Sequence, residues 1–582
     1  MMALRTERKK PSPAITTARR TQVVTTYGIG GLIPIESESF IVLGQNMWPE
    51  KARSPENTIY EPGLAKLLGV NHFYQPPSGE FFKLPLRRFP EIVTCPRCHR
   101  LDRFWLLARK DNKGDYRNEC RHCEVKTTLM PSRFIAACPE GHIQDFPYQW
   151  WVHEKSIPLE NTSEHKLKLV SDAKNSTLAG LIVRCSCGQT RSMAGALGKG
   201  LKSKCFSSSP WLIYGPDDDM DGKGKECSYP LTGLQRGASN VWYADIKSAI
   251  RIDRDDSPAE KLFEQYSELL GDPSDENYHI TLQVITQKES DVTPEELRKV
   301  HLRSIEEFSS PEVIEARLRA EEYEALKRDH PEVNGDELFV CKVHKNTHSD
   351  IFSSSLASIV EVPRLRVVNA LTSFTRVEGV SEDRTAKAKL STKRESWLPA
   401  TEIFGEGIFI ELNQDKLRSW ERSSFAKERA NRINNSSPNP GPISSRFLLL
   451  HSLAHALMME LSLQTGYPAT SLKERIYATE DQAGILLYTA SADSAGSLGG
   501  LTSHGKPEAF SKILQGAIVS ASWCSADPVC IEADAHGVNR FNLAACHYCM
   551  LAPEVSCEHS NGHLDRATLV GDTQNYHDGF FN

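Results

Sequence analysis

The sequence predicts an α+β protein of several domains, with a zinc-ribbon region near the N-terminus, a helical insertion and a C-terminal α/β zinc-binding domain. The chain has 582 residues, which is more than one hydrophobic core normally organises. Its 15 cysteines gather largely in CxxC and CxC pairs, the spacing typical of metal sites. A charged stretch with helical periodicity separates two regions of mixed strand and helix character.

The overall composition is that of a folded protein in a reducing compartment. Hydrophobic residues make up 39% and charged residues 25%, so extended disorder is not expected. The net charge of −6 gives no general attraction to nucleic acid, and any DNA contact must come from a local basic face or from a partner. The N-terminal run MMALRTERKK has no apolar signal core, and no apolar run is long enough to span a membrane. We therefore expect a cytoplasmic protein with no membrane partner, whose thiols are free to bind metal.

Changes in composition divide the chain into segments. The first residues are rich in Lys and Arg and are expected to form a flexible basic arm. The run ANRINNSSPNPGPISS is rich in Asn, Ser, Pro and Gly and is expected to be a linker. The expected order is the arm at 1–20, the N-terminal zinc-ribbon region at 21–256, the helical insertion at 257–335, an α/β segment at 336–429, the linker at 430–445 and the C-terminal zinc-binding domain at 446–582.

The N-terminal region opens with TQVVTTYGIGGLIPI, whose glycines suggest a nucleotide-binding loop. Such a loop opens a helix, whereas Pro34 blocks a helix here. Val23 and Val24 have strand character, so a tight turn between strands is predicted.

Two CxxC pairs in this region predict a zinc ribbon. Each pair is a knuckle that brings two sulfurs to one edge of a metal, and two knuckles a short distance apart form a Cys₄ cage. The predicted ligands are Cys95, Cys98, Cys120 and Cys123. Nearby basic residues favour contact with phosphate or with a partner protein, and these are Arg97, Arg100, Arg103, Arg121 and His122.

A second cage is predicted from a CxC pair and two more distant cysteines. Its expected ligands are Cys185, Cys187, Cys205 and Cys227. Cys138 and His142, spaced i and i+4, compete as ligands for the same metal, and the sequence leaves open which pairs close. The aromatic run FPYQWW that follows them is expected in a core or an interface rather than as a base-stacking platform.

Residues 258–330 have the pattern of charged amphipathic helices. The run Thr293–Glu296 is a capping box with proline at the first helical position. Ser310 and Pro311 repeat this arrangement and open another helix. The insertion is expected to be either a solvated subdomain or a docking surface that uses its apolar stripe. Cys341, which follows it, is expected to be a buried hydrophobic residue.

The second half of the chain contains strand runs and one strongly apolar helix. Strands are expected in IVEVPRLRVVNAL, EIFGEGIFIEL and ILLYT, and a helix in RFLLLHSLAHALMMELSLQTGY. His451 and His455 lie at i and i+4 on this helix, but Ser452 stands where the metalloprotease motif HExxH has its glutamate, so buried core histidines are predicted. The run GLTSHGK resembles a phosphate-binding loop, yet Pro507 takes the Ser/Thr position that must reach Mg²⁺. A turn is therefore predicted there, and no ATP hydrolysis is expected.

The C-terminal stretch carries the pattern around which the chain is organised. A CxxC knuckle and two further thiols in a short segment predict a tetrahedral thiolate cage for Zn²⁺. The predicted ligands are Cys530, Cys546, Cys549 and Cys557. Because the protein holds all four positions, this zinc is expected to stabilise the fold and to activate no water. The cysteine pattern of the whole chain predicts two to three structural zinc ions.

The same stretch resembles a known family. The runs GILLYT, AGSLGGL, DPVC, ACHYC and LDR are similar to the MrfA-like zinc-binding domain, which is often fused to the C-terminus of superfamily 2 DNA helicases. The rest of the chain carries no helicase motifs, and its order of motifs from TTYGIGGL to LDR resembles the DrmB family of the bacterial DISARM anti-phage system. That resemblance implies a separate subunit that pairs with a DrmA-like DNA helicase and reaches DNA through the complex.

Two functions are considered on these grounds. The sequence shows no paired-carboxylate nuclease motif and no phosphodiesterase pattern, which favours a non-catalytic accessory subunit of a helicase that helps engage invading phage DNA. The alternative is a zinc-dependent hydrolase or nuclease that acts on nucleic acid at an incomplete cage. Its metal would lie near Cys138 and His142, with Glu140 or Asp145 as the base.

Overall fold

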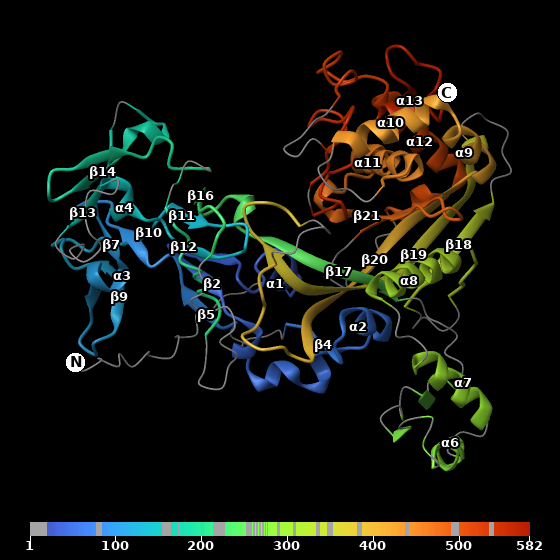
Figure 1. The fold of residues 1–582 in the computed structure, drawn as a ribbon, viewed down its shortest axis with the longest axis horizontal. Helices are drawn as coiled ribbons and strands as arrows, with labels where there is room; N and C mark the ends of the chain where they lie inside the picture. The colour runs from blue at the N-terminus through green and yellow to red at the C-terminus, as the bar shows by residue number, and fades with distance from the viewer. Residues whose placement is uncertain are drawn as a thin grey trace. The chain divides into compact units, whose positions relative to one another are not determined.

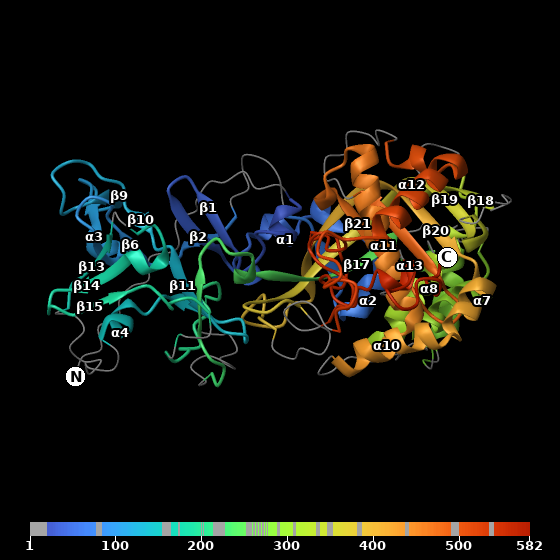
Figure 2. The same cartoon turned by 90° about the horizontal axis from the view of Figure 1, so that it is seen from above.

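The computed structural model divides the chain into two compact units, which we describe separately (Figure 1, Figure 2). The first contains Met1–Tyr60, Gly69–Ser248 and Asn369–Glu402, and the second contains Glu61–Leu68, Ala249–Val368 and Ile403–Asn582. The structure describes residues 20–76, 84–153, 165–172, 175–198, 201, 203–213, 227–251, 259, 262–263, 266, 269–270, 273, 275, 277–287, 292–305, 310–332, 338–345, 353–380, 387–436, 442–489, 500–534, 541–553 and 555–582. The basic arm expected at 1–20 lies outside these residues, apart from its last position.

The first unit consists mainly of short antiparallel strands. One sheet has the order β1-β2-β5, with β1 Leu32–Ile35, β2 Glu38–Val42 and β5 Leu86–Arg88. A second has the order β10-β6-β7-β13-β14-β15, with β10 Met130–Pro131, β6 Ile92–Thr94, β7 Arg100–Arg103, β13 Leu167–Ser171, β14 Leu181–Cys185 and β15 Thr190–Ser192. A third has the order β12-β11-β16, with β12 Ile143–Asp145, β11 Phe134–Ala137 and β16 Thr232–Gln235.

Smaller elements complete this unit. They are the strands β3 Thr58–Ile59, β4 His72–Tyr74, β8 Ala108–Lys110 and β9 Tyr116–Cys120, the beginning of β17 Tyr243–Arg251, and the helices α1 Gln22–Thr25, α3 Phe104–Leu107 and α4 Tyr148–His153. The FPYQWW run ends in α4, and its Phe146, Tyr148 and Trp151 are buried in a hydrophobic core, as predicted.

Strand β11 separates two hydrophobic cores, which explains why all four of its residues are apolar and buried. Ile135 and Ala137 point into a core with Trp211 and Phe374. Phe134 and Ala136 belong to the core that contains the aromatic residues of the FPYQWW run. Because side chains alternate between the two faces of a strand, a strand covered on both faces must be apolar throughout.

The glycine-rich N-terminal run forms a turn, but the residues before it are helical. Val23 and Val24 lie in α1 and are buried, whereas a strand was expected there. Their burial in the core outweighs the strand propensity of valine. Gly30 has a φ of +78°, and a Cβ atom there would lie 2.3 Å from the Phe374 ring, so this position requires glycine. Strand β1 follows the turn, as predicted.

The side chain of Arg376 connects three loops of the first unit through hydrogen bonds. Its guanidinium group is fully buried and donates hydrogen bonds to the carbonyl oxygens of Gly30, Gly141 and Val241 at 2.7, 2.8 and 2.6 Å. Burial lowers the pKa of Arg376 to about 9. The side chain therefore stays protonated at neutral pH and keeps its donors for these backbone acceptors.

The second unit is a layered α/β fold. Its sheet runs in the order β17-β19-β20-β22-β21, with β18 paired to β19. The bounds are β18 Val340–Lys345, β19 Leu356–Thr375, β20 Trp397–Leu412, β21 Leu472–Tyr477 and β22 Gly484–Thr489. The predicted strands are thereby confirmed. The boundaries between the two units fall inside β17, β19 and β20, so these strands contribute to both.

Helices cover both faces of this sheet. Ile408 and Ile410 of β20 pack into a core with the apolar helix α11 (Ser445–Thr465) and with α12 (Pro507–Ala521). Phe409, between them, packs on the opposite face with Tyr323 and Leu326 of α8 (Pro311–Leu326). The remaining helices of this unit are α2 Pro62–Leu68, α6 Tyr278–Thr286, α7 Pro294–Ile305, α9 Gln414–Glu421, α10 Ser424–Ser436 and α13 Ala567–Val570.

Helix α11 is the central core helix of the second unit, as the apolar sequence predicted. Among the described residues it is the one helix with the length and apolar composition of a membrane span, and 67% of its apolar window is buried inside the fold. Such burial is typical of a core helix. The segment before it differs from the expected linker at 430–445. Residues up to Ser436 continue α10, and Ala430 and Ile433 are buried there because they face the core on the helical period.

The capping box of the helical insertion is present. The backbone N–H of Thr293 donates to Glu296 Oε2 at 2.9 Å, and the N–H of Glu296 donates to Thr293 Oγ1 at 3.3 Å. Helix α8 likewise begins at Pro311 after Ser310, as predicted, although Ser310 makes no side-chain capping bond.

The substitution Thr293→Ala is expected to weaken the start of α7. Loss of an N-cap hydroxyl costs about 1 kcal/mol of helix stability. Hydrogen exchange of the full chain should show about fivefold faster exchange in the first turn of α7. Thr281→Ala is the matched control, because Thr281 lies within α6 and its hydroxyl donates to the carbonyl of Asn277. Unchanged exchange in α7 of Thr293→Ala would contradict this role of the cap.

Candidate metal centres

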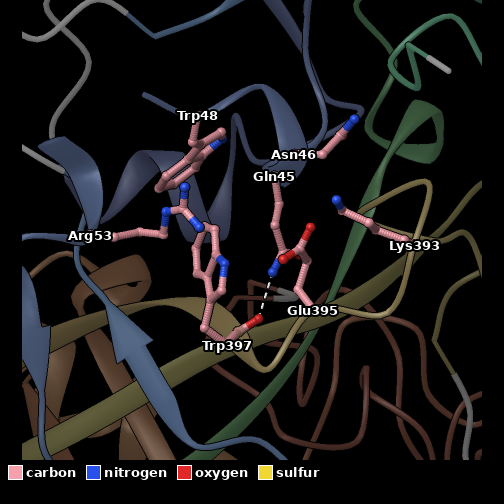
Figure 3. A pocket seen from close by; sticks show the side chains of 7 residues that line it. All are labelled: Gln45, Asn46, Trp48, Arg53, Lys393, Glu395 and Trp397. Atoms are coloured by element: carbon pink, nitrogen blue, oxygen red, sulfur yellow. Dashed lines mark hydrogen bonds between the residues drawn. The ribbon is translucent and has the colours of Figure 1, made fainter. Parts of the chain in front are cut away.

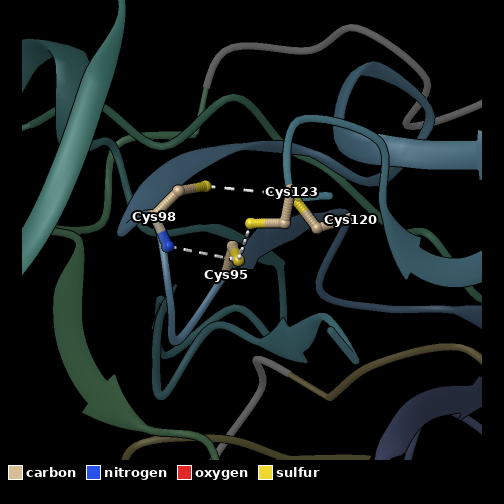
Figure 4. A group of neighbouring side chains, drawn as sticks. All are labelled: Cys95, Cys98, Cys120 and Cys123. Atoms are coloured by element: carbon tan, nitrogen blue, oxygen red, sulfur yellow. Dashed lines mark hydrogen bonds between the residues drawn. The ribbon is translucent and has the colours of Figure 1, made fainter. Parts of the chain in front are cut away.

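The first centre lies in the predicted zinc ribbon. The four thiols of Cys95, Cys98, Cys120 and Cys123 converge between the turn that joins β6 to β7 and the end of β9 (Figure 4). The Sγ atoms of Cys95 and Cys123 are 3.6 Å apart, and those of Cys98 and Cys120 are 3.8 Å apart. A tetrahedral Zn²⁺ with Zn–S bonds of about 2.3 Å separates its sulfurs by about 3.8 Å. The spacing of these thiols therefore fits a closed Cys₄ zinc site.

The surface of this ribbon is basic. Arg97, Arg103 and Arg121 are exposed. The pKa of His122 is lowered, first by burial and then by the nearby positive charges of Arg100, Arg121 and Lys166. The ribbon thus offers several cationic side chains to a negatively charged partner.

The second centre contains one Cys-x-x-x-His pair and two distant cysteines. Its ligand atoms belong to Cys138, His142, Cys205 and Cys227. Cys138 follows β11, and a turn at Gly141 with φ +90° brings His142 back so that its Nδ1 atom lies 3.5 Å from Cys138 Sγ. The sulfurs of Cys205 and Cys227 each lie 3.7 Å from that of Cys138. This arrangement fits a Cys₃His site.

The third centre was not expected from the sequence. Its ligand atoms belong to His153, His165, Cys185 and Cys187. His153 Nε2 lies 3.4 Å from Cys187 Sγ, and His165 Nδ1 lies 3.2 Å from Cys185 Sγ. His153 Nδ1 lies 2.7 Å from the carbonyl oxygen of Gln149, which fixes the tautomer in which Nε2 carries the lone pair that a metal would accept. The set fits a Cys₂His₂ site.

These two centres correct the predicted grouping of Cys185, Cys187, Cys205 and Cys227. The structure places the CxC pair at the end of β14, beside the end of α4, where two histidines complete the set. It places the other two cysteines beside the turn between β11 and β12. Long sequence intervals do not restrict which cysteine pairs share a metal, so the arrangement of the strands determines the grouping. The sequence signal from which the third centre could have been predicted was the pair His153 and His165.

The fourth centre lies in the C-terminal region of the second unit. Its ligand atoms belong to Cys524, Cys530, Cys546 and Cys549. The Sγ–Sγ distances are 3.5 Å for Cys524–Cys546 and 3.7 Å for both Cys530–Cys549 and Cys546–Cys549. The pKa of Cys530 is lowered to about 5 by hydrogen bonding from the Cys549 thiol, with a further contribution from Arg566, which favours the thiolate.

Cys524 takes the place that the sequence prediction gave to Cys557. Cys524 follows the end of α12, and its thiol lies beside the CxxC knuckle. The backbone N–H of Ala526 donates to Cys524 Sγ at 3.4 Å, and that of Cys546 donates to Cys549 Sγ at 3.3 Å. Cys557 instead lies beside His451, 3.2 Å from its Nε2 atom. The spacing of the two cysteines in WCSADPVC was the overlooked signal.

Asp145, one of the two acidic residues considered as catalytic bases, is held by a backbone contact. Asp145 Oδ1 accepts a hydrogen bond from the backbone N–H of Ile92 at 2.9 Å, which ties β12 to β6. Burial raises the pKa of this carboxyl to about 6. Cys205 and Cys227 complete the set with Cys138 and His142, so four protein atoms surround that metal position.

A small pocket of about 190 Å³ lies elsewhere in the first unit (Figure 3). Two of its walls are Trp48 and Trp397, whose ring centroids are 5.7 Å apart, and Gln45 Nε2 donates to the Trp397 carbonyl. The rest of the lining is Asn46, Arg53, Lys393 and Glu395. No histidine or cysteine is among the described residues that line it, so none of the four centres opens into this pocket.

Comparison with known proteins agrees with the C-terminal resemblance. Residues 453–550 match the MrfA Zn-binding domain, and residues 19–243 match a domain of unknown function (DUF8724). The chain is 31% identical over 580 residues to the DISARM protein DrmB of Bacillus paralicheniformis. The alignment covers 94% of this chain and 99% of that protein. The matched zinc-binding domain contains all four cysteines of the fourth centre.

Proposed function

The chain belongs to the family of the DISARM protein DrmB, and from that premise we propose that it is a non-catalytic, zinc-stabilised subunit that pairs with a superfamily 2 DNA helicase of the DrmA kind. In the complex it helps engage invading phage DNA in the cytoplasm. It contributes rigid surfaces and phosphate contacts, and the partner supplies the motor.

The closed form of the metal centres is the observation that carries the proposal. In each of the four centres, four protein ligand atoms lie within 4.8 Å of one another. A catalytic zinc keeps one position for water or substrate, whereas a structural zinc has all four positions filled by the protein. Zn²⁺ in such cages would brace short strands and loops that have little core of their own. For the same reason, the region of Cys138 and His142 gives no support to the hydrolase alternative.

The run GLTSHGK supports the absence of a motor. The backbone N–H groups of Leu501 and Thr502, near the start of this run, donate hydrogen bonds to the Glu406 carboxylate at 3.1 and 3.2 Å. Thr502 Oγ1 donates to the same carboxylate at 2.7 Å. A phosphate-binding loop needs free amides at this position and no negative charge. Pro507 then begins α12 without an N–H group.

The proposal is tested by comparing the purified chain with its complex. Co-expression with a DrmA-like helicase should yield a stable heterodimer that binds DNA with a single-stranded overhang. The chain alone should bind this DNA weakly and show no ATP turnover, while the complex should hydrolyse ATP. ATP turnover by the purified chain alone, or failure to associate with the helicase, would contradict the proposal.

The basic ribbon is the proposed DNA contact of this subunit. The double variant Arg97→Glu/Arg121→Glu is expected to weaken DNA binding by the complex at least tenfold in low salt. Each lost phosphate contact lowers the slope of log K against log salt by about one, so the slope should fall by about two. Fluorescence anisotropy over a salt series measures both quantities.

The matched control is Arg422→Glu/Lys427→Glu, which makes the same change in charge on exposed residues at the end of α9 and in α10. Its affinity and slope should stay close to those of the natural complex. Equal losses in both double variants would show that net charge alone matters and that the ribbon is not the contact.

A further inference from the structure

The core of the second unit holds another group of ligand atoms. They are two imidazole nitrogens, a carboxylate oxygen and a thiol sulfur that all lie within 4.8 Å of one another, and they belong to His451, His455, Glu474 and Cys557. We propose that these four side chains, called the core cluster below, bind a further divalent metal ion, a tetrahedral Zn²⁺. The matched zinc-binding domain ends at residue 550 and begins at 453, so two of these side chains lie outside it.

Three separate elements bring the core cluster together. His451 and His455 are one helical turn apart on α11 and point the same way. Glu474 is on β21, the strand next to the helix, and its Oε1 lies 3.1 Å from His451 Nε2 while its Oε2 lies 3.5 Å from His455 Nε2. Cys557 Sγ is 3.2 Å from His451 Nε2. Ligands at about 2.0 to 2.3 Å from a tetrahedral zinc are about 3.3 to 3.6 Å apart, which these edges approach.

The orientation of His455 indicates that a cation belongs between the side chains. Its Nδ1–H donates to the backbone carbonyl of Met550 at 2.7 Å, so the Nε2 atom of the neutral ring carries a lone pair. That lone pair faces Glu474 Oε2, and neither buried atom has a hydrogen-bond partner in the described structure. Two acceptors that face each other without a proton are unfavourable, and a metal ion removes the conflict. A backbone carbonyl behind a histidine is also the usual second contact of a zinc ligand.

The surroundings of Cys557 match those of the cysteines in the fourth centre. The backbone N–H groups of His559 and Asn561 both donate to Cys557 Sγ at 3.3 Å. Ser560 and Asn561 adopt positive φ angles of 51° and 59° in the turn that follows Cys557. Backbone amides stabilise a thiolate rather than a neutral thiol, and a thiolate is the form that binds metal.

Charge balance supports zinc. His451, His455 and Glu474 are fully buried, and Cys557 is 8% exposed. A carboxylate and a thiolate with two neutral imidazoles carry two negative charges, and a divalent ion makes the group neutral. Uncompensated charges in this interior would be strongly unfavourable. Nitrogen and sulfur ligands select zinc over magnesium or calcium, which prefer oxygen. With four protein ligands, the ion would join α11 and β21 to the segment after the fourth centre.

The competing explanation is a metal-free ion pair between a protonated histidine and Glu474. Crystals of the full chain, or of its complex, distinguish the two when diffraction data are collected on both sides of the zinc absorption edge. We expect an anomalous difference peak between the four side chains of the core cluster, separate from the peaks at the four centres. Density for the side chains without such a peak would overturn the proposal, whatever is found at the other centres.

Native mass spectrometry provides a second measurement with a matched pair of variants. Cys557→Ala should lower the zinc content of the full chain by one ion per molecule. Cys341→Ala removes another buried thiol, 3% exposed in β18 and bonded to the Arg328 carbonyl, and should leave the zinc content unchanged. An unchanged zinc content in Cys557→Ala would overturn the proposal. If Cys557→Ala does not fold, the anomalous peak in the natural chain decides alone.

Discussion

Alanine in place of Cys530 is expected to release one zinc ion and to unfold the C-terminal region of the second unit. Cys530 is fully buried in the fourth centre, where its sulfur lies 3.7 Å from that of Cys549. A structural zinc site supplies on the order of 10 kcal/mol of apparent folding free energy, as much as the whole stability of many domains. The segment that holds these cysteines has small hydrophobic clusters of its own, so little else would keep it folded.

Metal analysis and hydrogen exchange measure this effect together. Zinc content should fall by one ion per chain, and exchange protection should be lost first in residues 524–534 and 541–553. Cys341→Ala serves again as the control, because its thiol is buried away from every centre. Full zinc content with native protection in Cys530→Ala would show that the fourth centre does not hold the metal that stabilises this region.

Local sequence signals were sufficient for the elements that depend on neighbouring residues. The capping box predicted the start of α7, and the apolar run predicted α11, because both features are set by contacts within a few residues. The strands of the central sheet were predicted for the same reason. Strand propensity gave the wrong prediction at Val23 and Val24, because burial of both side chains in the core stabilises a helical turn there.

The ligand sets of the metal centres could be predicted from the sequence only in part. The zinc ribbon has two close knuckles, and its predicted cysteines lie together because the hairpins themselves bring them close. Cys557 is nearer than Cys524 to the C-terminal knuckle in sequence, yet Cys524 lies at the knuckle because it follows α12, while Cys557 faces α11. His142 was recognised as a possible ligand, but His153 and His165 were missed because a histidine becomes recognisable as a ligand only when a distant strand or loop supplies the rest of its set.

A buried ion pair joins α8 to the sheet and should be costly to break. Arg475 on β21 makes two hydrogen bonds of 2.6 Å to Glu322 on α8, and their side chains are only 1% and 4% exposed. Glu322 also accepts the backbone N–H of Ile250 at 3.0 Å and the hydroxyl of Tyr477 at 3.2 Å. Arg475 further approaches Glu558, 3.4 Å away. Removing the arginine would leave the buried Glu322 carboxylate without its main counter-charge, whereas Glu558 would keep its two hydrogen bonds from Arg319.

We therefore expect Arg475→Met to destabilise the second unit by about 3 to 5 kcal/mol, which corresponds to a fall in melting temperature of about 10 °C. The double variant Arg475→Met/Glu322→Gln removes the unpaired charge and keeps an acceptor for the amide of Ile250, so it should recover a large part of this loss. Thermal unfolding of the zinc-loaded chain measures both. A double variant as unstable as Arg475→Met would mean that packing of the arginine, and not the uncompensated charge of Glu322, determines the cost.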